Sequence, residues 1–144
     1  MPTSLPAQAL LAFAIATCAL ALWKGGTAER VAALLILVNT TIFIAKPLLP
    51  ASLVGVTFLM ADAMTAFGML ALTLRYGSLW LGGAMLLYAA QFALHAYYFV
   101  TERPADLFKA TVNNLNFLGI LLCLALGIAT AVRRRAAAAN SALD

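Results

Sequence analysis

Charged side chains are scarce in this sequence, and so are cysteine and histidine. Of its 144 residues, 10% are charged and 65% are apolar, and there are two cysteines and a single histidine. Soluble domains carry about a quarter charged residues, so this composition excludes a soluble enzyme and a disordered chain. Two cysteines form no disulfide framework, and one histidine excludes a multi-histidine metal site.

Phosphate-binding signatures are missing as well. Gly82 and Gly83 are followed by neither the lysine nor the Ser or Thr of a phosphate loop. The sequence also indicates no general base positioned beside a serine. The net charge of +4 comes from lysines and arginines scattered along the chain, so we expect no nucleic-acid partner. A role without catalysis is favoured.

Five apolar stretches are long enough to cross a bilayer as helices. A hydrocarbon core about 30 Å thick takes about 20 helical residues, and the stretches of that size are residues 5–23, 28–49, 53–74, 79–100 and 110–132. None alternates with the period of two that a barrel strand needs. The sequence therefore predicts one all-α membrane domain over 1–132, followed by a basic, disordered cytoplasmic tail over 133–144.

Segment 28–49 is the weakest of these spans. Its uninterrupted apolar part, residues 31–45, is about 22 Å long as a helix, and Lys46, Pro47 and Pro50 follow it. Proline lacks the N–H that a continuing helix donates. If this segment only dips into the bilayer, the protein has four spans instead of five.

The orientation follows from the lysines and arginines beside the spans, which collect on the cytoplasmic side. With five spans, one side holds Lys24, Arg30, Arg75, Arg133, Arg134 and Arg135. The other side holds only Lys46, Arg103 and Lys109. We therefore expect the N-terminus outside and the C-terminus in the cytoplasm.

Two ionisable residues, Asp62 and His95, fall well inside the expected spans. Such residues cost about 2.5 to 3.5 kcal/mol each at the bilayer centre, so they are expected to face an interior and to have partners. Counted from the turn at residues 75–78, Asp62 is about 20 Å deep, Gln91 about 18 Å and His95 about 24 Å. These three side chains are predicted to lie at nearly one level.

Polar residues on neighbouring spans are expected to reach this level too. Steps of three and four residues put one set on a single face of span 79–100: Tyr88, Gln91, His95 and Tyr98. Span 110–132 adds polar side chains, and Lys46, at the end of segment 28–49, could neutralise Asp62. The predicted binding site, in the outer half of the bilayer, consists of Asp62, Gln91, His95, Asn116, Tyr88, Tyr98, Asn113 and Lys46.

This cluster has more than one interpretation. As structure, its polar links hold helices together, each worth about 0.6 kcal/mol on average. As function, a histidine and a carboxylate in a wet cavity relay protons or bind an ion or polar ligand. A haem held by His95 with Met60 or Met64 is a further arrangement, although methionine in a membrane core more often fills space. The run at residues 39–41, Asn-Thr-Thr, bonds to backbone or neighbouring helices or lines the same cavity.

Three functional hypotheses follow. The first is a small homo-oligomeric inner-membrane protein that transports or binds an ion or small molecule. Oligomers are expected because small residues recur every four positions, which favours close helix packing: Gly119, Cys123, Gly127 and Ala131. The alternatives are an accessory subunit of a larger membrane complex, and a quinone- or haem-associated redox component using His95 and Tyr98. The sequence identifies no cofactor.

Ten scattered positions carry a resemblance to a known group of proteins. They are Trp23, Lys24, Gly25, Gly26, Glu29, Arg30, Asp62, Trp80, Gln91 and His95. At these positions, and in hydropathy over most of its length, the chain resembles small uncharacterised multi-span inner-membrane proteins of alphaproteobacteria. The resemblance implies a bacterial inner membrane and no particular activity.

Overall fold

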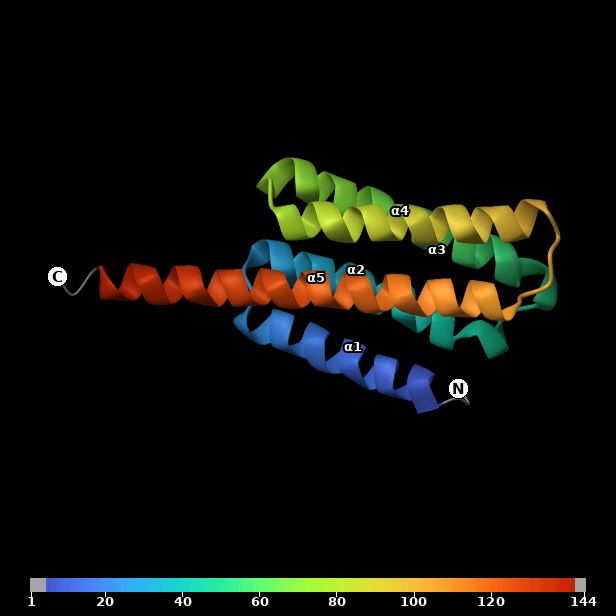
Figure 1. Ribbon diagram of the computed structural model, residues 1–144, viewed down its shortest axis with the longest axis horizontal. Helices are drawn as coiled ribbons and strands as arrows, with labels where there is room; N and C mark the ends of the chain where they lie inside the picture. The colour runs from blue at the N-terminus through green and yellow to red at the C-terminus, as the bar shows by residue number, and fades with distance from the viewer. Residues whose placement is uncertain (1–4, 142–144) are drawn as a thin grey trace.

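The computed structural model describes residues 5–141, which fold into five α-helices and one short 3-10 helix (Figure 1). The helices are α1 (Leu5–Lys24), α2 (Thr27–Ile44), η1 (Lys46–Leu48), α3 (Ala51–Tyr76), α4 (Leu79–Val100) and α5 (Leu107–Asn140). Each of the five α-helices is long and apolar enough to cross a membrane. The expected all-α bundle is therefore confirmed, with α2 among the helices that are able to span.

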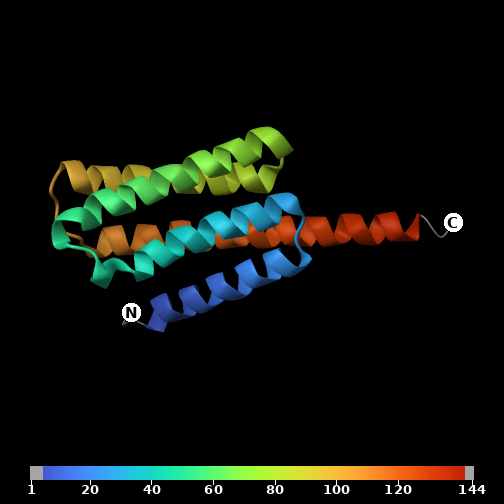
Figure 2. The same ribbon diagram turned by 180° about the vertical axis from the view of Figure 1, so that it is seen from behind.

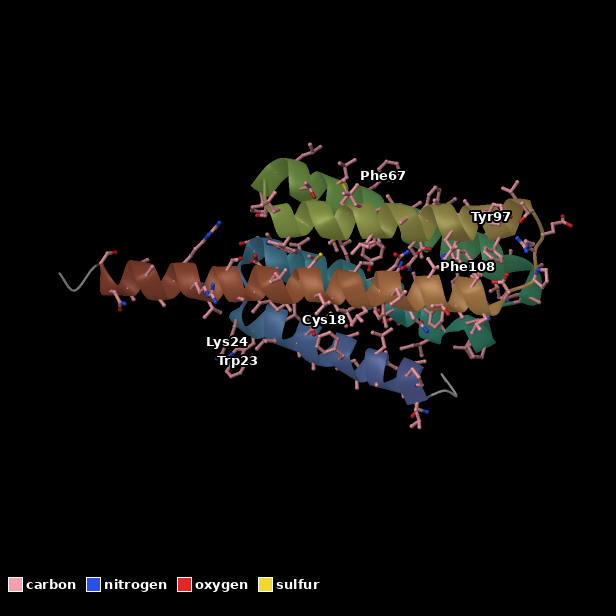
Figure 3. The ribbon with its side chains drawn as sticks, in the orientation of Figure 1. Cys18, Trp23, Lys24, Phe67, Tyr97 and Phe108 are labelled. Atoms are coloured by element: carbon pink, nitrogen blue, oxygen red, sulfur yellow. The ribbon has the colours of Figure 1, made fainter. Side chains whose placement is uncertain are left out.

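The outside of this bundle is apolar. Every α-helix turns large hydrophobic side chains outward, and Ile15, Leu34, Phe67, Leu86 and Leu126 are each more than half exposed. Figure 3 shows Phe67 pointing away from the other helices. A soluble protein rarely exposes so much contiguous apolar surface, so these faces are suited to contact lipid tails.

Two helix boundaries differ from those expected. Helix α2 ends at Ile44, and residues 46–48 form the 3-10 turn η1, because Pro47 cannot donate to the preceding turn. Helix α5 continues to Asn140, so the expectation of a disordered tail is wrong for residues 133–140. Arginine and alanine, which fill this stretch, are strong helix formers. Residues 142–144 of that tail lie outside the described part of the chain.

The five α-helices form a ring. Each packs against its neighbours in the sequence, α3 and α4 most extensively, and a contact between α5 and α1 closes the ring. Figures 1 and 2 show α4 and α5 on one side and α3 and α2 on the other, with α1 at the edge of the bundle. The tight α3–α4 turn uses Gly77 in the left-handed conformation, φ 59°, which glycine adopts most easily.

The two halves of the ring are packed differently. Toward the Gly77 turn, small buried side chains such as Ala21, Ala32 and Ala84 pack with Leu81 and Leu124. Small residues allow helix backbones to approach closely. Toward the opposite end, where the connections at 45–50 and 101–106 lie, α1 diverges from α5 (Figure 1). This half of the bundle is where space is left.

The long helix α5 is bonded to the α1–α2 turn. The Arg135 guanidinium donates hydrogen bonds to the carbonyl of Lys24 at 3.1 Å and to that of Gly25 at 2.9 Å. Inside the turn, the buried Glu29 carboxylate accepts the Gly26 N–H at 2.9 Å. The last carbonyls of a helix have no partner within the helix, so Arg135 satisfies groups that α1 itself leaves open.

Packing of α4 against α5 gives a first testable prediction. A Cβ at Gly127 would lie 2.6 Å from the Trp80 indole, whereas a Cβ at Gly82 would meet only Thr73, at 3.9 Å. Both substitutions to alanine gain about 1 kcal/mol of helix propensity, but overpacking costs about 1 to 3 kcal/mol. We expect Gly127→Ala to unfold at a lower temperature than Gly82→Ala, measured by circular dichroism in detergent. Equal melting temperatures would contradict the contact.

Candidate functional site

The carboxylate of Asp62, on α3, is the centre of a buried hydrogen-bond network. His95 Nδ1, on α4, is paired with Asp62 Oδ2, and Gln91 Nε2, one turn earlier, donates to Oδ1 at 3.3 Å. Asp62 is 2% exposed and Gln91 5%. The structure thus brings together the three side chains whose depths were predicted to coincide.

A residue of α2 that was not among the predicted site residues completes this network. Asn39 Nδ2 donates to Asp62 Oδ1 at 3.1 Å and to Thr65 Oγ1 at 3.3 Å. The Thr65 hydroxyl in turn donates to the Ala61 carbonyl at 2.7 Å. These links join α2, α3 and α4 inside the bundle. A bond to a neighbouring helix is one of the roles that the sequence left open for the run at 39–41.

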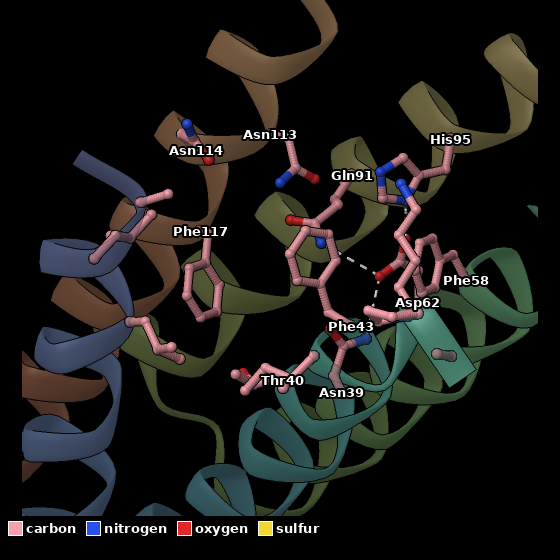
Figure 4. Close-up of a pocket in the computed structure, with 17 residues that line it drawn as sticks. Asn39, Thr40, Phe43, Phe58, Asp62, Gln91, His95, Asn113, Asn114 and Phe117 are labelled. Carbon is pink, nitrogen blue, oxygen red and sulfur yellow. Dashed lines mark hydrogen bonds and ion pairs between the residues drawn. The ribbon is translucent and has the colours of Figure 1, made fainter. Parts of the chain in front are cut away.

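Beside the network lies a cavity of about 360 Å³, to which every α-helix contributes (Figure 4). Five of the predicted residues line it: Asp62, Gln91, His95, Asn113 and Lys46. Asn39 and Thr40 line it too, which is one of the roles that the sequence left open for the run at 39–41, and Asn114 is a polar lining residue that was not predicted. Ligand sites are mostly apolar cavities of about 300 to 1,000 Å³ with a few placed polar groups, and this cavity has that composition.

Aromatic rings form much of the apolar wall. Phe43 of α2 and Phe58 of α3 stack with their ring centroids 5.6 Å apart, and Phe117 of α5 lines the cavity as well. Figure 4 shows the Phe117 ring facing the space between α1 and Asn113. None of these phenylalanines stood out in the sequence, because phenylalanine in a membrane helix is most often a lipid-facing or packing residue.

A second, more open cavity of about 600 Å³ lies at the same end of the bundle. Its lining includes Ser52, Tyr98, Arg103 and Lys109, near the α4–α5 connection. His95 and Phe58 line both cavities. These two side chains therefore separate the inner cavity from the outer one.

Two predicted residues lie outside the cavity lining. Tyr88 is fully buried in the helix core, and its hydroxyl has no hydrogen-bond partner within the described residues. Asn116 of α5 is not among the lining residues, and its buried Nδ2 is also unpartnered within residues 5–141. Depth alone did not predict which way α5 turns this amide.

Tyr98 has a different role from the one predicted. Its hydroxyl donates to Asp106 Oδ1 at 2.6 Å, and the same oxygen accepts the Lys109 N–H at 2.8 Å, which caps α5. The Lys109 ammonium lies 4.7 Å from the centre of the Tyr98 ring. The Lys109 N–H and then the Tyr98 hydroxyl lower the pKa of Asp106 below its ordinary value. Tyr98 thus fixes the α4–α5 connection and reaches only the outer cavity.

Two pairings that the sequence left open are not seen. Asp62 is paired with His95, and within residues 5–141 Lys46 forms no ion pair with a carboxylate. Met60 and Met64, considered as partners of His95 for a haem, are 54% and 72% exposed on the outer face of α3. They lie two residues to either side of the inward Asp62, so neither is able to share an axial site with His95. Over the described residues, no three His, Cys, Asp or Glu side chains are grouped to hold a metal ion.

No known protein-family model, curated protein or solved structure matches this chain. Its class therefore rests on the fold and on the cavity. They define a multi-pass α-helical membrane protein with an ionisable, hydrogen-bonded pair inside the bundle.

Removing the Asp62 carboxylate should destabilise the bundle. Asp62→Ala takes the acceptor away from His95, Asn39 and Gln91 together, and interhelical polar links average about 0.6 kcal/mol each. We expect a loss of about 2 kcal/mol, measured by reversible unfolding in mixed dodecylmaltoside and SDS micelles. Asp62→Asn keeps one acceptor oxygen and should lose less. Equal stability of Asp62→Ala and the unaltered protein would contradict the network.

The Asp106 cap should make stability depend on acid pH. Because the folded-state pKa is lowered, the stabilising contribution is complete above the ordinary aspartate pKa and is lost as the pH falls below about 4. Asp106→Asn keeps a capping side chain that does not titrate. The difference in melting temperature between the unaltered protein and Asp106→Asn should therefore become smaller from pH 7 to pH 3. The control is Glu102→Gln, which changes an exposed carboxylate of the same connection. In that background, Asp106→Asn should show the same decrease.

Proposed function

We propose that this protein binds a small polar solute or ion in the inner cavity and carries it across the membrane. The observation that supports this most is the Asp62–His95 pair, which lines a cavity to which five membrane-length helices contribute. Ionisable residues inside membrane bundles are costly and generally mark substrate, ion or proton pathways. A purely structural link between α3 and α4 would not need a cavity beside it.

The position of His95 also supports a route for the solute. His95 and Phe58 border both cavities, and both cavities lie toward the connections at 45–50 and 101–106. The half of the bundle toward Gly77 is filled by buried side chains. A solute would enter from this end of the bundle and bind beside Asp62. Release to the other side would require the filled half to open.

We further propose a bacterial inner membrane and an orientation for this route. More lysines and arginines lie on the side of the α1–α2 and α3–α4 turns than at the cavity end. Such residues collect on the cytoplasmic side of the membrane. The cavity would then open to the outside, with the C-terminus in the cytoplasm. The small-residue face of α5 gives no support to the homo-oligomer expected from the sequence, because Gly119 and Gly127 pack against Leu87 and Trp80 of α4 within the same chain.

Electrophysiology on solid-supported membranes tests the function. Proteoliposomes would be perfused separately with sodium, potassium, ammonium, primary amines, carboxylates, amino acids and glycerol. We expect at least one solute to give a transient current with the unaltered protein, and Asp62→Asn to reduce that current at least tenfold. His95→Gln should also reduce the current, because it removes the side chain that is paired with the Asp62 carboxylate.

The control for this experiment is Thr41→Val. Thr41 is exposed on α2, and its hydroxyl donates only to the Leu37 carbonyl of its own helix, at 2.8 Å. This variant should retain the full current. If no solute gives a current that depends on Asp62, the transport proposal is wrong and the accessory-subunit hypothesis takes its place.

A further inference from the structure

The orientation of one buried amide indicates the chemistry of the missing ligand. Gln91 Nε2 donates to the Asp62 carboxylate, and a carboxylate accepts only, so the amide oxygen must point the other way. That oxygen, Oε1, is buried and has no hydrogen-bond partner within residues 5–141. Leaving a buried acceptor unpaired costs about 1 to 3 kcal/mol. A donor from outside the chain would remove this cost.

Two more unpartnered oxygens belong to residues that line the same cavity. They are Oγ1 of Thr40, on α2, and Oδ1 of Asn113, on α5. Figure 4 shows the Gln91, Asn113 and Thr40 side chains around the region occupied by the Phe43 and Phe117 rings. Three helices thus each supply one acceptor. A protonated primary amine carries three N–H donors and no acceptor, which matches this set.

The rings beside these oxygens favour a cation over water. Aromatic faces attract ammonium groups, and Phe43, Phe58 and Phe117 line the cavity. Water would satisfy the oxygens but would gain nothing from the rings.

A cation alone, however, would have to pass Lys46. Lys46 is the one lysine among the residues that line the cavity; it is exposed on η1 at the bundle end, and no carboxylate of residues 5–141 pairs with it. A carboxylate on the solute would pair with this ammonium. The cavity therefore has acceptors inside, a free cation at its mouth and an apolar wall between them.

Building on the solute-binding function proposed above, we infer that this cavity takes a small amino acid with an apolar side chain. Its ammonium group would bind the oxygens of Thr40, Gln91 and Asn113, and its carboxylate would face Lys46. The side chain would lie against the phenylalanine rings.

Three matched probes separate the parts of this inference. L-Leucine has both charges, isopentylamine lacks the carboxylate, and 4-methylpentanoate lacks the amine. Binding of tritiated leucine to the purified protein in detergent would be measured by scintillation proximity, with the other two as competitors. We expect leucine to bind with the highest affinity, isopentylamine to compete more weakly, and 4-methylpentanoate to compete least.

Substitutions test which residues bind the ammonium and the carboxylate of the solute. Thr40→Val removes one acceptor and should weaken leucine and isopentylamine alike, by about tenfold. Its matched control is Thr41→Val, the same change one residue along α2, on the exposed side, and it should leave both affinities unchanged. Lys46→Gln should weaken leucine about tenfold and leave isopentylamine unchanged, so that the preference for the amino acid disappears.

Several results would overturn the inference. Leucine that does not bind, 4-methylpentanoate that competes better than isopentylamine, or a Lys46→Gln variant that keeps the preference for leucine would each do so. If another solute still gives a current that depends on Asp62, only the amino-acid assignment is wrong. If no solute does, the proposed function fails with it.

Discussion

The need to surround one buried carboxylate with donors is the constraint on which this structure depends. Water solvates a carboxylate outside the membrane, and inside an apolar bundle side chains must replace that water. Asp62 is surrounded by His95 and Gln91 from α4 and by Asn39 from α2. Because the acceptor lies on α3 and the donors on its two neighbours, one side chain sets the rotation of three helices. The polar faces gathered in this way form one wall of the cavity.

The cavity exists because the ring is filled unevenly. Alanine and leucine side chains fill the half toward Gly77, and α1 approaches α2 and α5 there. In the other half, α1 contributes Ala7, Leu10 and Leu11 to the lining of a space that is otherwise mostly polar or aromatic. Burial of Asp62 and an unfilled interior are therefore two results of the same helix arrangement.

Position along the helix axis was predictable from the sequence, and rotation about it was not. Counting residues from a three-residue turn put Asp62, Gln91 and His95 at one level, and hydrogen bonds join them there. The same count put Asn116 at that level, yet α5 turns it away from the cavity lining. Tyr98 shares a face with His95, but the Asp106 carboxylate of the connection accepts its hydroxyl. The position of the Tyr98 hydroxyl is set by a residue beyond the end of α4, and the periodicity of residues within α4 carries no information about that contact.

The bonds from Arg135 to the last carbonyls of α1 limit how the filled half could rearrange. They tie the far end of the longest helix to the α1–α2 turn, so a tilt of α5 has to drag that turn along or break two hydrogen bonds. No comparable bond ties the α3–α4 turn to α5 within the described residues. The hairpin of α3 and α4 thus lacks an anchor at its turn, and it would pivot by giving up its packing against α2 and α5 and the bonds from Asn39 to Asp62 and Thr65.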